Sequence, residues 1–160
     1  MAHKKVKIAI IGAGAVGTST AFDLSIQGLC DEIVLIDINR DKAFAEALDM
    51  QHSVAYQSRT VTINPGSYED CGDADIVVVT AAAPYTPGQR RLDMLEVSAK
   101  IIKSIIPPIM RSGFCGHFII VTNPVDIISN YVYRLSGLPS NQIIGTGTAL
   151  DSARLRGLIA

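Results

Sequence analysis

Three glycines near the N-terminus, Gly12, Gly14 and Gly17, stand between an apolar run and a segment with helical spacing. In a Gly-x-Gly-x-x-Gly pattern, the first glycine permits a tight turn and the second lets the backbone approach a pyrophosphate. The third lets the helix pack closely against the strand. A helix N-terminus offers unpaired N–H groups and a positive dipole end to phosphates. The pattern therefore predicts a phosphate-binding turn between a strand and a helix.

An acidic residue, Asp37, lies 20 residues beyond Gly17, at the end of a second apolar run. Its carboxylate can accept hydrogen bonds from the hydroxyls of an adenosine ribose and would repel a 2′-phosphate, which favours NAD over NADP as the cofactor. Simpler interpretations stay open at this point. The segment can be a glycine-rich turn beside a solvated aspartate, and Arg40 can be either a phosphate ligand or a surface residue at a helix start.

The elements that must position these residues follow from hydrophobic periodicity. Runs of β-branched residues predict strands, which are Val6–Ile11, Ile33–Asp37, Thr60–Ile63, Ile76–Ala81, Phe118–Thr122 and Gln142–Ile144. Helical spacing predicts helices between most of them, which are Val16–Gln27, Asp41–Ala55, Leu92–Met110 and Val125–Leu135. Several strands are apolar on both faces, as parallel strands covered by helices are. With right-handed crossovers, this alternation predicts an α/β fold with a doubly wound parallel sheet of the Rossmann type.

Three local features refine this prediction. The third and fourth strands are joined by a short connection, Asn64–Asp75, without an obvious helix. The pair Pro107-Pro108 lacks two N–H donors, so we expect it to kink or end the long helix predicted over Leu92–Met110. The last residues, Leu155–Ala160, have the pattern of an unfinished helix with an exposed apolar edge.

Composition excludes several classes of protein. The 160 residues are 48% hydrophobic and 18% charged, which predicts a folded chain rather than disorder or a fibrous rod. A net charge of −1 argues against nucleic-acid binding, and no apolar run approaches the roughly 20 residues that cross a membrane. Without a repeat or linker, we expect one domain over residues 1–160. No metal site and a reducing, cytoplasmic location are expected because the cysteines lack ligand or disulfide spacing; they are Cys30, Cys71 and Cys115.

Four further segments carry a resemblance to a known family. They are Ala83-Pro-Tyr-Thr-Pro-Gly-Gln-Arg-Arg91-Leu, Val121-Thr-Asn123-Pro-Val-Asp126, Gly145-Thr-Gly-Thr148 and Leu150-Asp151-Ser-Ala-Arg154. With the glycine-rich turn, they resemble the lactate and malate dehydrogenase family over essentially the whole chain, and most of all the bacterial L-lactate dehydrogenases. The resemblance implies an oxidoreductase that transfers hydride between NAD and the C2 carbon of a small 2-hydroxy or 2-oxo acid.

On the substrate side, the resemblance implies a catalytic pair, Arg91 and Asp151. Arg91, on a mobile lid, would polarise the substrate carbonyl as water is excluded, and Asp151 would orient a catalytic histidine. Asp151 can instead be a helix N-cap. Arg154 would hold the substrate carboxylate in a bidentate pair, and Asn123 would contact substrate, although Asn-Pro is also a common turn. The full substrate-binding set is Tyr85, Arg91, Asn123, Asp126, Asp151 and Arg154.

On the cofactor side, the resemblance adds further positions to the glycines and Asp37. They are Val16, Lys42, Tyr68, Ala82, Ala83, Ser104, Val121, Thr122, Asn123 and Thr146. Ser104 can equally be an ordinary polar surface residue of its helix. Arg156 matches a position that binds an allosteric sugar bisphosphate in many bacterial lactate dehydrogenases, and a solvated arginine is the alternative.

Two features depart from the family pattern. Tyr85 stands where lactate enzymes have Gln and malate enzymes have Arg. Because a phenol cannot pair with a second carboxylate, a dicarboxylate substrate is disfavoured, and lactate or pyruvate is the default. The second departure is the lack of a suitable catalytic histidine, since His3, His52 and His117 are all predicted away from the site. We therefore expect the cofactor-binding half of a dehydrogenase, with the substrate domain absent from this chain.

Other functions remain open from the sequence. The chain can belong to a malate or another 2-hydroxyacid dehydrogenase, or it can be a non-catalytic NAD-binding module or an interaction protein. Arg91, Asp151 and Arg154 argue against a pure binding module, which has no need of substrate-handling side chains. A homo-oligomer is expected, because in the family helices of this domain form the dimer contact.

Overall fold

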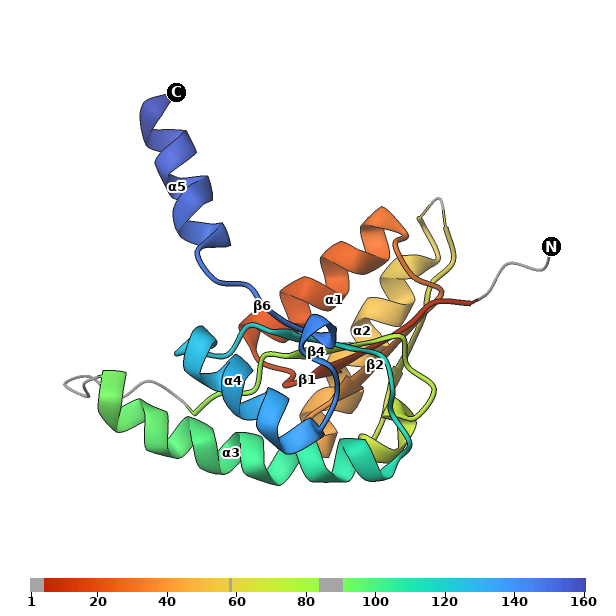
Figure 1. The fold of residues 1–160 in the computed structure, drawn as a ribbon. Coiled ribbons are helices and arrows are strands. Elements are labelled where there is room, and N and C mark those ends of the chain that lie inside the picture. Colours follow the sequence, from red (N-terminus) through yellow and green to blue (C-terminus); the bar gives the residue numbers. More distant parts are fainter. Residues whose placement is uncertain (1–4, 58, 84–90) are drawn as a thin grey trace.

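The computed structural model describes residues 5–57, 59–83 and 91–160, with the side chains of residues 91–94 outside that description. A sheet of six parallel strands has the order β3-β2-β1-β4-β5-β6. The strands are β1 Lys7–Ile11, β2 Glu32–Ile36, β3 Thr62–Pro65, β4 Ile76–Val79, β5 His117–Ile120 and β6 Ile143–Gly145. This order confirms the doubly wound sheet, in which strands are added on one side of β1 up to β3 and on the other side from β4 onward (Figure 1).

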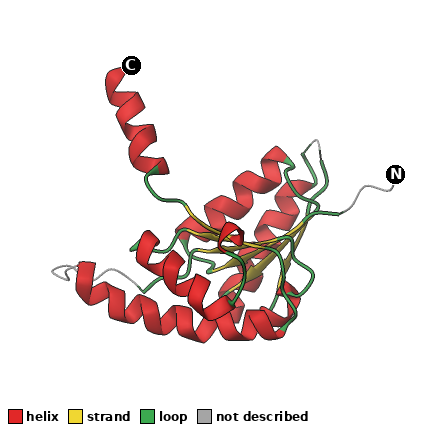
Figure 2. Ribbon diagram, viewed as in Figure 1, coloured by secondary structure: helices red, strands yellow, loops and turns green. Residues whose placement is uncertain are grey.

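Helices cover both faces of the sheet, as the ribbon coloured by secondary structure shows (Figure 2). The helices are α1 Ala15–Gln27, α2 Arg40–Val54, α3 Arg91–Arg111, α4 Val125–Ser136 and α5 Ala149–Ile159, with short 3-10 turns η1 Tyr68–Cys71 and η2 Ser140–Gln142. The turn η1 lies in the short connection predicted between the third and fourth strands. The six strands and the helices α1 to α4 lie within two residues of their predicted bounds, and β3 begins two residues later than expected.

Two buried clusters form the core, one on each face of the sheet. Along β1, Ile8 and Ile10 pack with residues of α1 and α2, while Ala9 and Ile11 pack with residues of α3 and α4. This alternation follows from the two-residue period of a strand, whose successive side chains point to opposite faces. Because both faces of the central strands β1, β2 and β4 are buried, these strands had to be apolar throughout, which is why the sequence showed continuous apolar runs there.

The helix α3 corrects one expectation, because it does not end at its two prolines. Pro107 and Pro108 lie inside α3, which continues to Arg111. Each proline costs about 3 kcal/mol in a helix interior, but burying each large aliphatic side chain stabilises the fold by about 1.5–3 kcal/mol. The face of α3 that meets the sheet buries four isoleucines, each at most 3% exposed: Ile102, Ile105, Ile106 and Ile109. Tertiary packing therefore offsets the missing N–H donors.

The last helix, α5, extends away from the sheet (Figure 1). The helix begins at Ala149, six residues before the predicted helical segment Leu155–Ala160. Every residue of α5 is exposed, which confirms the predicted exposed apolar edge. The large apolar side chains on it are 57–85% exposed and are Leu150, Leu155, Leu158 and Ile159.

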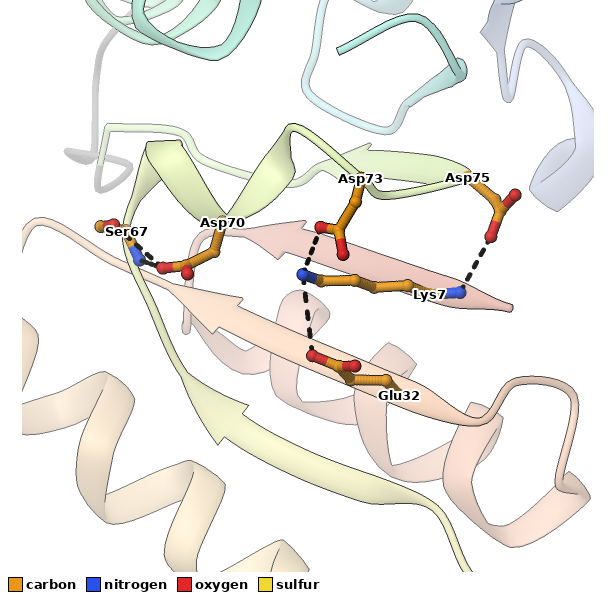
Figure 3. A network of polar contacts seen from close by, with 6 residues as sticks. All are labelled: Lys7, Glu32, Ser67, Asp70, Asp73 and Asp75. Carbon is orange, nitrogen blue, oxygen red and sulfur yellow. Dashed lines mark hydrogen bonds and ion pairs between the residues drawn. The ribbon is translucent and has the colours of Figure 1, made fainter. Parts of the chain in front are cut away.

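At the amino edge of the sheet, Lys7 links three elements through carboxylates (Figure 3). Its backbone N–H donates to Asp75 at 3.0 Å, and its Nζ donates to Asp73 and lies 3.7 Å from Glu32. Partial burial disfavours the charged amine, but the Asp73 hydrogen bond and the neighbouring carboxylate charges outweigh it, so the pKa of Lys7 is raised. This network ties β1 to β2 and to the start of β4, at the edge opposite the glycine-rich turn.

Candidate nucleotide-binding site

The turn between β1 and α1 contains three glycines with different surroundings. Gly12 has φ +110°, and a Cβ there would lie 2.9 Å from both the Ala81 nitrogen and the Thr80 hydroxyl oxygen. A Cβ on Gly17 would overlap the carbonyl oxygen of Gly12. Gly14 differs, because a Cβ there would meet no atom within 4 Å. Two glycines are thus required by the protein itself, whereas the space at Gly14 is open to a ligand.

Gly14 is also the N-cap of α1, in extended conformation and with no side chain to cap the helix. The N–H groups of the first turn of a helix have no partner within the helix, and they carry its positive dipole end. Gly14, Ala15 and Val16 are all exposed. An anion can therefore reach this end of α1, and the lack of a Cβ at Gly14 lets it come close to the backbone.

Asp37 immediately follows β2 and faces the glycine-rich turn. Its Oδ2 accepts a hydrogen bond from the Ala13 N–H at 2.7 Å, and its Oδ1 accepts from the Asn39 N–H at 2.8 Å. The carboxylate is partly exposed, and each oxygen has a further lone pair for a sugar hydroxyl. Nearby, Tyr68 begins η1, and burial first and the Asp37 charge second raise the pKa of its phenol. Tyr68 is therefore neutral beside the carboxylate.

The carboxyl ends of β4 and β5 form the next part of the same sheet edge. Ala82 and Ala83 follow β4, and Val121 and Asn123 follow β5. Between them, the buried Thr122 donates through its hydroxyl to the Ala81 carbonyl at 2.9 Å. This bond joins the chain after β4 to the chain after β5. Because ligands of doubly wound sheets bind at this edge near the switch in strand order, these predicted positions lie where such a ligand belongs.

The segment around Asn123 is tied to α3. The hydroxyl of Ser98, on α3 and only 2% exposed, donates to the Asn123 carbonyl at 3.3 Å. The side chain of Asn123 is exposed, and its peptide bond to Pro124 is cis. Asp126 lies exposed in the first turn of α4, and Thr146 follows β6, where its N–H donates to the Ile120 carbonyl at 3.0 Å.

Asp151 and Arg154 lie together on α5 and form an exposed ion pair of 3.4 Å. Thr148 is the N-cap of α5, so the alternative role of Asp151 as N-cap is wrong. Asp151 instead lies in the first turn, where its charge complements the helix dipole. Arg156 is exposed in the last turn.

Of the remaining predicted positions, Lys42 lies near the site edge at the start of α2, Ser104 lies further along α3, and the side chains of the others are outside the description. Lys42 is exposed in the first turn of α2, where its backbone N–H donates to Asn39, and Ser104 is exposed on α3, with its hydroxyl bonded to the Ile101 carbonyl at 2.7 Å. Tyr85 lies outside the described residues. Arg91 begins α3, and its side chain is outside the description.

The described histidines agree with the sequence expectation. His52 is exposed near the end of α2, and His117 is exposed at the start of β5, at the edge opposite Asn123. His3 lies outside the described residues. Within the described ranges, no three His, Cys, Asp or Glu side chains group to hold a metal ion, and no helix has the length and apolarity needed to cross a bilayer.

Sequence reasoning missed two hydroxyl side chains that hold the site. Thr80 contacts the glycine-rich turn and Ser98 contacts the Asn123 segment, yet neither belongs to a recognisable motif. The available signal for Thr80 was a single polar residue within an otherwise apolar run. Ser98 gave no signal, because its partner lies 25 residues away in sequence.

The chain is similar in sequence and in structure to bacterial L-lactate dehydrogenases. The chain is 51% identical over 154 residues to "L-lactate dehydrogenase 3" of Bacillus cereus and to an L-lactate dehydrogenase of Staphylococcus epidermidis, covering 96% of this chain and 49% of each relative. This chain superimposes on the crystal structure of the minor L-lactate dehydrogenase of Enterococcus mundtii in the ligands-bound form with a TM-score of 0.94 and 44% sequence identity. The match covers 98% of this chain and 50% of that one. The chain therefore spans about half the length of the relatives it matches.

A family profile covers most of the chain. Residues 6–145 match the family described as lactate/malate dehydrogenase, NAD binding domain, which indicates NAD as the cofactor. The matched range contains the glycine-rich turn, Asp37 and the carboxyl ends of all six strands. The chain belongs to the lactate/malate dehydrogenase family, to its NAD-binding domain.

Proposed function

We propose that this chain is the NAD-binding part of an L-lactate dehydrogenase-type enzyme, which interconverts lactate and pyruvate or a related 2-hydroxy and 2-oxo acid pair. The observation that carries the proposal is the open, exposed backbone at Gly14 with the Asp37 carboxylate beside the same turn. An open cradle at a helix N-terminus fits a pyrophosphate, and an adjacent carboxylate fits an unphosphorylated ribose.

In the proposed site, the residues divide the cofactor between them. Backbone N–H groups at the start of α1 bind the pyrophosphate, and Asp37 accepts the ribose hydroxyls while repelling a 2′-phosphate. Val16, Tyr68, Ala82 and Ala83 lie along the adenosine and pyrophosphate side. The positions expected toward the nicotinamide are Val121, Thr122, Asn123 and Thr146. NAD, when bound, accepts or supplies the hydride.

The proposed substrate residues act on the carboxylate and carbonyl of the acid. Arg154 binds the carboxylate. Its pairing with Asp151 does not oppose this, because an exposed ion pair of this kind contributes no more than about 1 kcal/mol. Arg91 polarises the carbonyl, Asn123 and Asp126 line the substrate side, and Tyr85 disfavours a second carboxylate. Arg156 is a candidate contact for an allosteric sugar bisphosphate.

The setting of the protein is part of the proposal. We propose a cytoplasmic homo-oligomer. The three cysteines, all described, are free thiols, as a reducing compartment allows. Several large apolar side chains on α1 and α2 are 44–56% exposed, which supports a contact with another copy; they are Phe22, Ile26, Phe44 and Leu48.

The proposal is tested by titrating this chain with NADH, then with NADPH, and adding pyruvate to the NADH complex. We expect NADH to bind at least about tenfold more tightly than NADPH, because Asp37 repels the additional phosphate. We expect no loss of the nicotinamide absorbance after pyruvate is added, because neither described histidine lies near the site to donate a proton. Failure of the chain to bind either dinucleotide would overturn the proposed function.

A further inference from the structure

One peptide group of the glycine-rich turn, the peptide between Gly12 and Ala13, is held at both of its polar ends. Its carbonyl oxygen, on Gly12, accepts a hydrogen bond from the Thr80 hydroxyl at 3.0 Å. Its N–H, on Ala13, donates to Asp37 Oδ2 at 2.7 Å. The two partners come from the strand ends on either side of β1, since Thr80 follows β4 and Asp37 follows β2. The orientation of this peptide is therefore set by tertiary contacts.

The Thr80 hydroxyl fills the space beneath the turn. It also lies 3.1 Å from the Ile11 carbonyl, and Cβ atoms placed on Gly12 and Gly17 would stand 2.9 and 2.8 Å from its oxygen. Gly12 and Ala13 are buried, while Gly14 is exposed. The Gly12 carbonyl thus faces the protein interior, where it lies against Gly17. A carbonyl turned toward the exposed side would instead place a partial negative charge where a phosphate is expected.

We propose that Thr80 is a positioning residue for pyrophosphate binding, which acts by fixing the Gly12–Ala13 peptide with its carbonyl inward. The inference rests on the proposed function and extends it to a residue outside the glycine motif. The same peptide also donates to Asp37, but the Asn39 N–H holds that carboxylate independently, so loss of the Thr80 hydroxyl should affect the pyrophosphate turn more than the ribose contact. Thr80 itself contacts backbone, and no contact with the cofactor is required.

The test compares Thr80→Val, which keeps the shape of the side chain but removes the hydroxyl, with Thr80→Ser, which keeps the hydroxyl. Each variant and the unaltered chain are titrated with ADP-ribose, which contains the pyrophosphate, and with adenosine, which lacks it. Amide hydrogen exchange of Ala13 and Gly14 is measured without nucleotide, as a report on the turn alone. Removing one partner of a buried hydrogen bond gives about a three- to tenfold loss in affinity when the bond serves binding.

We expect Thr80→Val to bind ADP-ribose about three- to tenfold more weakly, with faster exchange at Ala13 and Gly14 and with adenosine affinity within twofold. Thr80→Ser should stay within twofold for both ligands. Equal ADP-ribose affinity in Thr80→Val and the unaltered chain overturns the inference alone. An equal loss for adenosine and ADP-ribose also overturns it, because that result indicates general damage to the fold. An unaltered chain that binds no ADP-ribose overturns the proposed function together with the inference.

Discussion

Adding one methyl group at each of three glycines should separate the roles of the backbone in this domain. Gly14, Gly17 and Gly157 differ in what a Cβ would meet. At Gly14 and Gly157 it would meet nothing within 4 Å, whereas at Gly17 it would overlap the Gly12 carbonyl oxygen and lie 2.8 Å from the Thr80 hydroxyl oxygen. Gly157 lies on the exposed helix α5 and serves as the matched control.

The expected magnitudes follow from these surroundings. Gly17→Ala should lower the free energy of unfolding by about 3 kcal/mol, because the start of α1 must move away from the turn. For a chain of this size, that loss lowers Tm by roughly 6–12 °C. Gly14→Ala should cost at most about 1 kcal/mol, the difference between Gly and Ala at an N-cap. Its NADH affinity should fall at least about tenfold, since the methyl group occupies the side from which a phosphate approaches.

The assay pairs thermal unfolding, followed by circular dichroism, with NADH titration by fluorescence. Gly157→Ala should leave the NADH affinity unchanged to within about twofold and should not lower Tm, because α5 is exposed along its whole length; the better helix propensity of alanine should raise Tm by at most about 4 °C. A Gly17→Ala variant as stable as the unaltered chain would falsify the close approach of α1 to the turn. A Gly14→Ala variant that keeps its NADH affinity would refute the turn as the phosphate site.

Three further predictions concern charges. Lys7→Met should lower the free energy of unfolding by roughly 1–3 kcal/mol in urea denaturation, because Asp73 and Glu32 lose their cation; unchanged stability would show that the network contributes nothing. Asp70→Ala should cost about 1 kcal/mol at pH 7, since Asp70 accepts from the Ser67 N–H at 2.7 Å. The hydrogen bonds from Ser67 lower the pKa of Asp70 below its unfolded value. The difference in free energy of unfolding between variant and parent should therefore shrink as pH falls through the folded pKa. A difference that stays constant in acid would contradict this cause. With this domain joined to the C-terminal half of an L-lactate dehydrogenase relative, Tyr85→Arg should raise oxaloacetate turnover relative to pyruvate, and an unchanged ratio of the two rates would remove Tyr85 as the selector.

Much of the fold was predictable because its signals are local or periodic. The central strands β1, β2 and β4 are buried on both faces, so their apolar runs were continuous and easy to place. The glycine pattern between β1 and α1 requires only neighbouring residues. The prolines of α3 showed the limit of this reasoning, because local propensity predicted a kink or an end at Pro107-Pro108, whereas the helix continues to Arg111 and buries four isoleucines around them.

The residues of the candidate site were likewise predictable where their signal is local and were missed where their contacts are distant in sequence. Asp37 was found from its spacing to Gly17, but its hydrogen bond to Ala13 could not be read from spacing. Thr80 and Ser98 were missed, since each bonds to backbone that is distant in sequence. Asp151 and Arg154 are three residues apart on one helix, so their pairing is local, yet the sequence alone did not distinguish the N-cap role of Asp151 from a place in the first turn.

The amino-acid sequence by itself determined the order of the elements, the phosphate-binding pattern and the family to which the chain belongs. These depend on residue types and on short spacings, which the sequence states directly. Only the tertiary structure decided how the Gly12–Ala13 peptide is oriented, because its two partners arrive from β2 and β4, strands that the sheet places on either side of β1. A hydrogen bond between such elements depends on distances of a few tenths of an ångström, and the packing of the whole sheet sets those distances.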